Sequence, residues 1–132
     1  MPKLLLIAFT CCAFICNAQV LNTDSIGSIS KSDNIYNKPL LGDSLSSGFC
    51  IVIKKEVKAH KHQHHSEQVV VLEGEGLMKL DGKSFTVKKG DVVFIPKNAV
   101  HSVKTTGTAP LKVVSIQSPR FDGSDRVFVE EK

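Results

Sequence analysis

Short runs of apolar and β-branched residues alternate with polar turn residues along the chain from residue 48 onward. Runs of this kind, bounded by turn residues, are typical of β-strands. After the first 18 residues no stretch repeats apolar residues at a helical spacing, so the pattern predicts strands throughout. We expect about eight short strands, at residues 49–53, 69–72, 77–80, 84–87, 92–95, 102–104, 111–117 and 127–130.

Turn residues indicate how these strands connect. Asp81 and Gly82 separate two of the predicted strands and form a strong hairpin signal, because both central positions of a type I′ turn need a positive φ. A further turn is predicted around Gly90, and Pro96 ends the strand that follows it. Short antiparallel strands with frequent turns are typical of an all-β sandwich or a small barrel.

The first 18 residues have a different character. Lys3 supplies a positive charge, residues 4–15 are apolar and uncharged, and residues 16–18 offer a small-x-small cleavage site. An apolar stretch of about 12 residues is shorter than the roughly 20 that span a bilayer. We therefore predict a cleaved signal peptide at residues 1–18, a periplasmic or secreted protein, and no stable membrane insertion after cleavage. An uncleaved anchor or a buried helix is the alternative.

Composition limits the remaining possibilities. A chain of 132 residues forms one domain, and 42% hydrophobic with 23% charged residues is ordinary for a globular protein. We divide the mature chain into a flexible lead-in with a first strand at residues 19–47 and a folded domain at residues 48–132. The net charge is +4 and the basic residues are scattered, so no nucleic-acid partner is expected.

Cysteine usage excludes a disulfide scaffold. Three of the four cysteines lie in the predicted signal peptide, so only Cys50 remains in the mature chain. We interpret Cys50 as a buried inert thiol, with a reactive or intermolecular thiol as the alternative. A small exported domain without disulfides must then be stabilised by core burial, by a metal or by oligomerisation.

Histidines are the strongest chemical feature of the chain. Four of the five lie within residues 60–65, Glu67 follows closely, and His101 comes later. Side chains at positions i and i+2 of a strand share one face, so His60 and His62 would project together. Neutral imidazole is a common metal ligand, and the cluster suggests a metal site. Considered alone, however, a histidine-rich tract is also consistent with a solvated surface loop.

Two separate segments resemble the two motifs of the cupin superfamily, in the form found in small single-domain cupins. The segments are His60-x-His62-x4-Glu67-x6-Gly74 and Gly90-x5-Pro96-x-Asn98-x2-His101. The motifs cover residues 60–101, and the flanking strands extend the likeness to most of residues 48–130. The resemblance implies a double-stranded β-helix, which is a small jelly-roll barrel with a metal held inside.

Carried over to this sequence, the resemblance makes His60, His62, Glu67 and His101 the ligands of one divalent transition metal. Nitrogen and oxygen ligands without thiolate suit Mn, Fe, Co, Ni, Cu or Zn. Four protein ligands leave about two positions of an octahedral ion open for water, substrate or dioxygen, unlike a saturated structural zinc.

The sequence departs from the family pattern at two positions. Asn98 replaces a glycine, and asparagine tolerates a left-handed backbone. Thr105 replaces an asparagine that follows the last histidine. His64 and His65 are not needed as ligands, and we interpret them as exposed loop residues; a hydrogen-bonding partner of the site, a proton shuttle or a register shifted to use His64 are alternatives.

Three functions fit such a site. The first is a small exported metal-dependent enzyme, an oxygenase or isomerase acting on a small polar metabolite. The second is a non-catalytic module that binds or senses a small ligand, and the third is a jelly roll that the metal only stabilises. Five side chains could line the mouth, with a solvated surface role as the alternative for each: Tyr36, Glu56, His64, Arg120 and Arg126. A homodimer is expected by analogy with other cupins.

Overall fold

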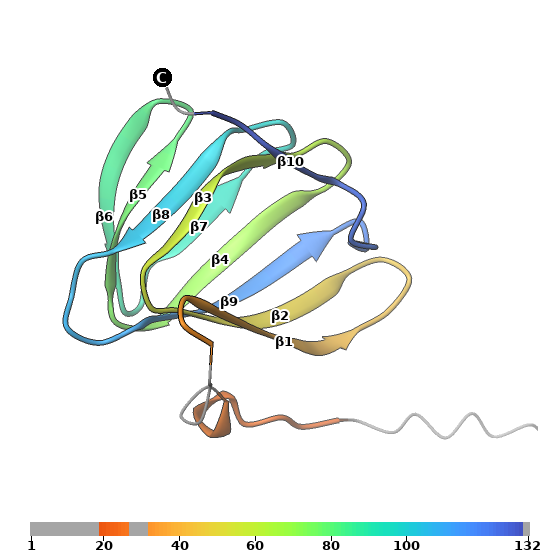
Figure 1. Cartoon of the computed structure of the whole chain (residues 1–132). Helices are drawn as coiled ribbons and strands as arrows, with labels where there is room; N and C mark the ends of the chain where they lie inside the picture. The colour runs from red at the N-terminus through yellow and green to blue at the C-terminus, as the bar shows by residue number, and fades with distance from the viewer. Residues whose placement is uncertain (1–18, 27–31, 131–132) are drawn as a thin grey trace, which may run out of the picture.

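The computed structural model describes residues 19–26 and 32–130; the predicted signal peptide lies outside these residues. The described residues form two five-stranded antiparallel sheets (Figure 1). One sheet has the order β1-β2-β9-β4-β7 and the other the order β10-β3-β8-β5-β6. The strands are β1 (Ile35–Gly42), β2 (Ser47–Ile53), β3 (Glu56–His62), β4 (Ser66–Glu73), β5 (Glu75–Leu80), β6 (Lys83–Lys88), β7 (Val92–Ile95), β8 (His101–Thr105), β9 (Leu111–Ser118) and β10 (Arg126–Phe128).

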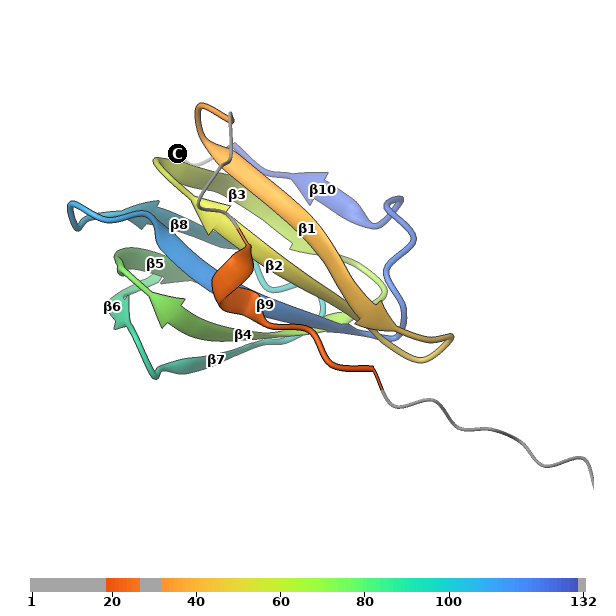
Figure 2. The same cartoon turned by 90° about the horizontal axis from the view of Figure 1, so that it is seen from below.

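The two sheets curve around one interior, and this arrangement is the jelly roll that the resemblance implied (Figures 1 and 2). The prediction of an all-β fold is therefore confirmed. Away from the histidines, apolar side chains from both sheets point into the interior. The buried core cluster consists of Ile53, Val71, Met78, Val87, Ile95, Ala99, Leu111 and Val113.

All eight predicted strands are present, and two more occur. β1 lies in the segment where a first strand was expected ahead of the main domain. β3 was not among the eight, because its sequence EVKAHKH contains few of the apolar residues that mark a strand. The residues that make β3 hard to recognise are the ones that give it a chemical role.

Positive backbone φ angles occur where the turn chemistry predicted them. Asp81 and Gly82, with φ of 45° and 78°, close the hairpin between β5 and β6. Asn98 has a φ of 64°, so asparagine adopts the left-handed conformation in place of the family's glycine. The Thr105 hydroxyl donates a hydrogen bond to the carbonyl of Ile53 at 2.9 Å. Both departures from the family pattern are thus accommodated.

The N-terminal described segment contains a short 3-10 helix, η1 (Thr23–Ser25), on the outer side of β2 and β9 (Figure 2). Ile26, which follows it, is buried. The part of the chain that the structure describes contains no helix long and apolar enough to cross a membrane.

Candidate metal centre

Strand pairing brings the three motif histidines together. β3 and β8 are antiparallel neighbours, and His60 lies directly opposite His101 in their register. His62 follows two residues later on β3, so its side chain shares the inward face with that of His60. Glu67 lies on β4 in the facing sheet. Residues 41 positions apart along the chain thereby meet inside one barrel.

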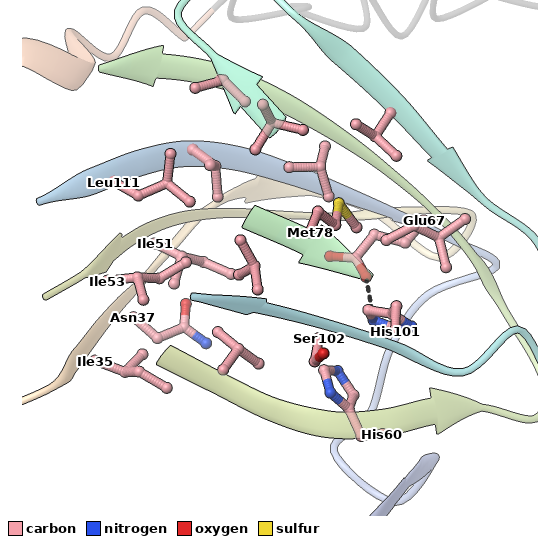
Figure 3. Close-up of a pocket in the computed structure, with 18 of the residues that line it drawn as sticks. Ile35, Asn37, Ile51, Ile53, His60, Glu67, Met78, His101, Ser102 and Leu111 are labelled. Carbon is pink, nitrogen blue, oxygen red and sulfur yellow. Dashed lines mark ion pairs between the residues drawn. The ribbon is translucent and has the colours of Figure 1, made fainter. Parts of the chain in front are cut away.

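The four side chains form a tight buried cluster. The ring centroid of His60 lies 4.2 Å from that of His101 and 5.0 Å from that of His62. The Glu67 Oε2 atom lies 3.4 Å from Nε2 of His101 and 3.7 Å from Nε2 of His62. Each of these residues is at most 6% exposed. Figure 3 shows His60, His101 and Glu67 directed toward the same interior space.

Hydrogen bonds to backbone carbonyls fix the tautomer of two of these imidazoles. Nδ1 of His60 donates to the carbonyl of Lys58 at 2.8 Å, and Nδ1 of His101 donates to the carbonyl of Ala99 at 3.0 Å. A carbonyl can only accept, so each neutral ring has its lone pair on Nε2. Metal-binding histidines commonly use this arrangement, because the outer hydrogen bond orients the ring and raises its basicity.

Several nitrogens of the cluster have no hydrogen-bond partner among the described residues. Both ring nitrogens of His62 and Nε2 of His101 are buried without a hydrogen-bond partner in the described part of the chain. Buried polar atoms of this kind are costly and uncommon. A cation bound between the rings and the Glu67 carboxylate would satisfy one nitrogen of His62 and Nε2 of His101, so His60, His62 and His101 can hold a metal ion.

The electrostatics of the site keep the imidazoles of His60 and His62 neutral and the Glu67 carboxylate charged. Burial, followed by repulsion from His101, lowers the pKa of His60 to about 3. Burial, followed by repulsion from His65, lowers the pKa of His62 to about 4. Although burial opposes it, interaction with His101 and with the Ser115 hydroxyl lowers the pKa of Glu67 to about 2. Neutral imidazole and ionised carboxylate are the forms that ligate a metal.

Two residues of β9 support Glu67 and were not identified from the sequence. The Ser115 hydroxyl donates to Oε1 of Glu67 at 2.5 Å, and the Gln117 amide donates to Ser115 Oγ at 3.2 Å. Both side chains are at most 2% exposed. The available signal was their position: Ser115 and Gln117 continue the inward alternation of Leu111 and Val113, where polar residues are unusual.

The interpretation of His65 as an exposed loop residue is wrong, whereas that of His64 holds. His64 is exposed, but His65 is only 2% exposed, with its ring centroid 4.1 Å from that of His62. Nδ1 of His65 lies 2.6 Å from Oδ2 of Asp125. The sequence could not show this burial, because Asp125 is 60 residues away and reaches His65 only through the fold.

Asp125 also holds the loop that joins β3 to β4. Its carboxylate accepts hydrogen bonds from the backbone amides of Gln63, His64 and His65, at 2.6 to 3.2 Å. Although burial opposes it, the amide hydrogen bonds of His64 and Gln63 lower the pKa of Asp125. His62, His65 and Asp125 form a second group with ligand-type atoms. Because the Asp125 oxygens already accept several hydrogen bonds, the group around His60 and His101 suits a metal better.

Of the five residues expected at the mouth, the structure brings one to the site. Arg126 lines the interior cavity, and its guanidinium carbon lies 6.0 Å from the ring centroid of Phe121. Glu56 and Arg120 are exposed and line other depressions of the surface. Tyr36 alternates on β1 with Ile35 and Asn37, which line the cavity, so its side chain lies on the opposite face.

The cavity beside the cluster has a volume of about 140 Å³. His60, Glu67 and His101 contribute to its wall, and most of the remaining lining residues are aliphatic. Figure 3 shows the histidines, Glu67 and Ser102 at one end and Leu111, Ile51 and Ile53 at the other. A small molecule in this space would contact the polar cluster and an apolar wall at the same time.

Comparison with known proteins agrees with this geometry. The family model of the cupin domain matches residues 49–117, which is more than half of the chain. The chain belongs to the cupin family. A double-stranded β-helix protein from Klebsiella pneumoniae has the same fold, with a TM-score of 0.74 at 19% identity over 87% of this chain and 100% of that one.

Curated relatives share shorter segments with the chain. An uncharacterized protein from Methanocaldococcus jannaschii is 39% identical over 71 residues, which are 54% of this chain and 57% of the relative. An oxalate-binding protein from Thermotoga maritima is 35% identical over 60 residues, which are 46% of this chain and 50% of the relative. The chain thus spans about half the length of these two relatives.

Proposed function

We propose that His60, His62, Glu67 and His101 bind one divalent transition metal, and that the site acts as a small metal-dependent enzyme of oxygenase or isomerase type. One observation carries this proposal: buried imidazole nitrogens without a hydrogen-bond partner lie around the ionised carboxylate of Glu67. Sites with four protein ligands leave room for a further ligand on an octahedral ion. The adjoining cavity supplies the space for a small metabolite.

When bound, such an ion would supply Lewis acidity, or electron transfer if it is redox-active. The chain's own residues have three tasks. The carbonyls of Lys58 and Ala99 orient the rings of His60 and His101. Ser115 orients Glu67. The aliphatic wall keeps bulk water away from a bound molecule.

A second function, a module that binds or senses a small ligand without turnover, is favoured by a specific observation. Among the described residues that line the cavity, the histidines and the one carboxylate all belong to the metal cluster. No separate acid or base stands beside the substrate space in this part of the chain. The oxalate-binding relative also supports a binding role for a small anion.

The presence of the cavity favours these two functions over a purely structural role for the metal. A metal that only stabilised the barrel would need no substrate space beside it. A homodimer and export through cleavage of residues 1–18 are further proposals, supported by family analogy and by the sequence of that segment. Intact mass of the protein recovered from the cell envelope or medium tests export, because retention of residues 1–18 would contradict it.

Elemental analysis of the purified protein tests the metal proposal. We expect one transition-metal ion per chain in the native protein and in the His64→Ala variant, whose side chain is exposed. The His101→Ala variant is expected to lose the ion. A native protein without stoichiometric metal, or equal loss in both variants, would contradict the proposal. Substrate turnover or oxygen consumption across a metabolite panel then distinguishes the enzyme from the binding module.

A further inference from the structure

The wall of the cavity is almost entirely aliphatic. The apolar lining residues are Ile35, Ile51, Ile53, Val57, Val69, Val71, Met78, Val87, Val93, Ile95, Val103, Leu111 and Val113. They come from both sheets, and several belong to the buried core. Asn37 is an uncharged exception toward the apolar end (Figure 3). An aliphatic wall offers no hydrogen-bond partners, so it disfavours hydroxyl groups or a second charge on that part of a ligand.

The size of the cavity limits the apolar body of such a ligand. Its volume is about 140 Å³. An apolar protein cavity of roughly 150 Å³ accommodates benzene, so about six carbon atoms fill a space of this size. A sugar or nucleotide would have to bury several hydroxyl groups against the aliphatic wall.

The polar end of the cavity favours a negative charge. Glu67 is the sole carboxylate among the described lining residues, so a divalent cation in the cluster would leave a net positive charge there. Arg126 is the sole lysine or arginine among the same residues. It lies opposite His62 in the pairing of β10 with β3, which places its backbone beside the cluster. Both charges would attract an anionic head group.

We propose that the ligand of this site is a small monoanion, with a carboxylate-type head at the histidine end and an apolar body of about six carbons within the aliphatic cavity. The proposal rests on the proposed function for the charge of the metal. It narrows the small polar metabolite expected from the sequence to a molecule that is polar at one end only.

Calorimetric titration of the full-length metal-loaded protein with three matched probes tests this proposal. Hexanoate carries the proposed head and body, hexanamide has an uncharged head, and adipate has a second carboxylate at the far end. We expect hexanoate to bind about tenfold more tightly than either of the others. Hexanamide lacks the negative charge that the histidine end attracts. The second carboxylate of adipate would be buried against aliphatic side chains, which do not solvate it. Adipate or hexanamide binding as tightly as hexanoate, or no binding of hexanoate, would overturn the proposed ligand class.

Metal content measured on the same samples separates the two proposals. Stoichiometric metal without a preference for hexanoate would contradict the proposed ligand class and support the metal site. A preference for hexanoate in protein that retains no metal removes the metal proposal and leaves the ligand class. The two failures are therefore distinguishable.

Matched variants locate the binding site. Val113→Phe fills the cavity from β9, whereas Val114→Phe places the same ring on the outer face of that strand. We expect about a tenfold loss of hexanoate affinity for Val113→Phe and less than about a twofold change for Val114→Phe. Ile51→Phe, at a half-buried lining position on β2, is a second filling variant if the ring at position 113 prevents folding. Filling variants that fold and retain full hexanoate affinity would contradict the assignment of the cavity.

Discussion

Single side chains determine the chemistry of the cluster, and Glu67 is its only anion. Its two oxygens have different roles: Oε1 accepts the hydrogen bond of Ser115, and Oε2 faces His62 and His101. The sequence spacing identified Glu67 and the three histidines, because the motifs place them in register. Ser115, Gln117 and Asp125 could not be assigned in this way, since their roles depend on contacts between distant strands.

Replacing Glu67 with glutamine tests whether the charge of this side chain matters. The amide keeps the size of the carboxylate but removes the negative charge from a site that is at most 6% exposed. We expect metal affinity to fall by at least about 10-fold, because the loss of the one formal counter-charge of a buried cation costs more than the loss of an outer hydrogen-bonding partner. The control is Glu73→Gln, which removes a carboxylate on the same strand that pairs with Lys112. Equal affinity in Glu67→Gln and the native protein, measured by chelator competition, would contradict the assigned role.

Strands and turns follow from the sequence more directly than the site does. The hairpin at Asp81 and Gly82 was predictable because its residues are among the few that adopt positive φ. β3 was not predictable from apolar patterning, because His60 and His62 occupy its inward positions. The role of the C-terminal segment depends on the fold, because Asp125 contacts a loop about 60 residues earlier in the chain.

Position 74 requires glycine for two reasons, a positive φ and a close approach of another backbone segment. It has a φ of 77°, and an added Cβ would collide with the carbonyl of Pro110. Gly90 has a φ of 95° but open space around it. We expect Gly74→Ala to lower the free energy of unfolding by about 3 kcal/mol and Gly90→Ala by about 1 kcal/mol. Urea denaturation measures both, and equal losses would contradict the close approach at Gly74.

Asp125 connects the C-terminal segment to the loop between β3 and β4. Asp125→Asn leaves amide donors without a charged acceptor, so we expect the free energy of unfolding to fall by about 2 kcal/mol. Asp122→Asn is the matched control, because Asp122 is exposed and bonds only to nearby Ser124 among its described partners. Thermal or urea unfolding of the two variants gives the comparison. A loss no larger for Asp125→Asn than for Asp122→Asn would show that the loop does not depend on this carboxylate.

The whole molecule combines an expected fold with a cavity that the sequence could not reveal. The ten strands of the described residues form two sheets, in the jelly roll that the two motifs implied. The cavity is the space that inward side chains from both sheets leave between them. Its size and shape depend on the packing of distant strands, so no local sequence pattern predicts them. Its aliphatic wall changes the expected ligand from a polar molecule to one with an apolar body.

Protonation of the cluster affects the stability of the whole metal-free protein. The pKa of His60 in the folded chain is about 3 and that of His62 about 4, against 6.5 for an ordinary histidine. Between these values the unfolded chain binds more protons, so stability falls as the pH falls. Together these two histidines lower the free energy of unfolding by about 2 kcal/mol between about pH 6.5 and about pH 5.5.

Chemical denaturation in the presence of a chelator measures this dependence. His64→Ala is expected to retain the slope, and His62→Leu is expected to reduce it in part, because His60 and His65 remain with lowered pKa values. A metal-free protein whose stability is constant over this range would contradict the burial of neutral histidines.

X-ray absorption spectroscopy of the metal-loaded protein tests the central claim most directly, because it reports the atoms bound to the ion. His60, His62 and His101 predict scattering from three imidazole rings, together with oxygen from Glu67 and from any solvent ligand. A first shell with one imidazole or none, or with sulfur, would contradict the convergence of these side chains on a single ion.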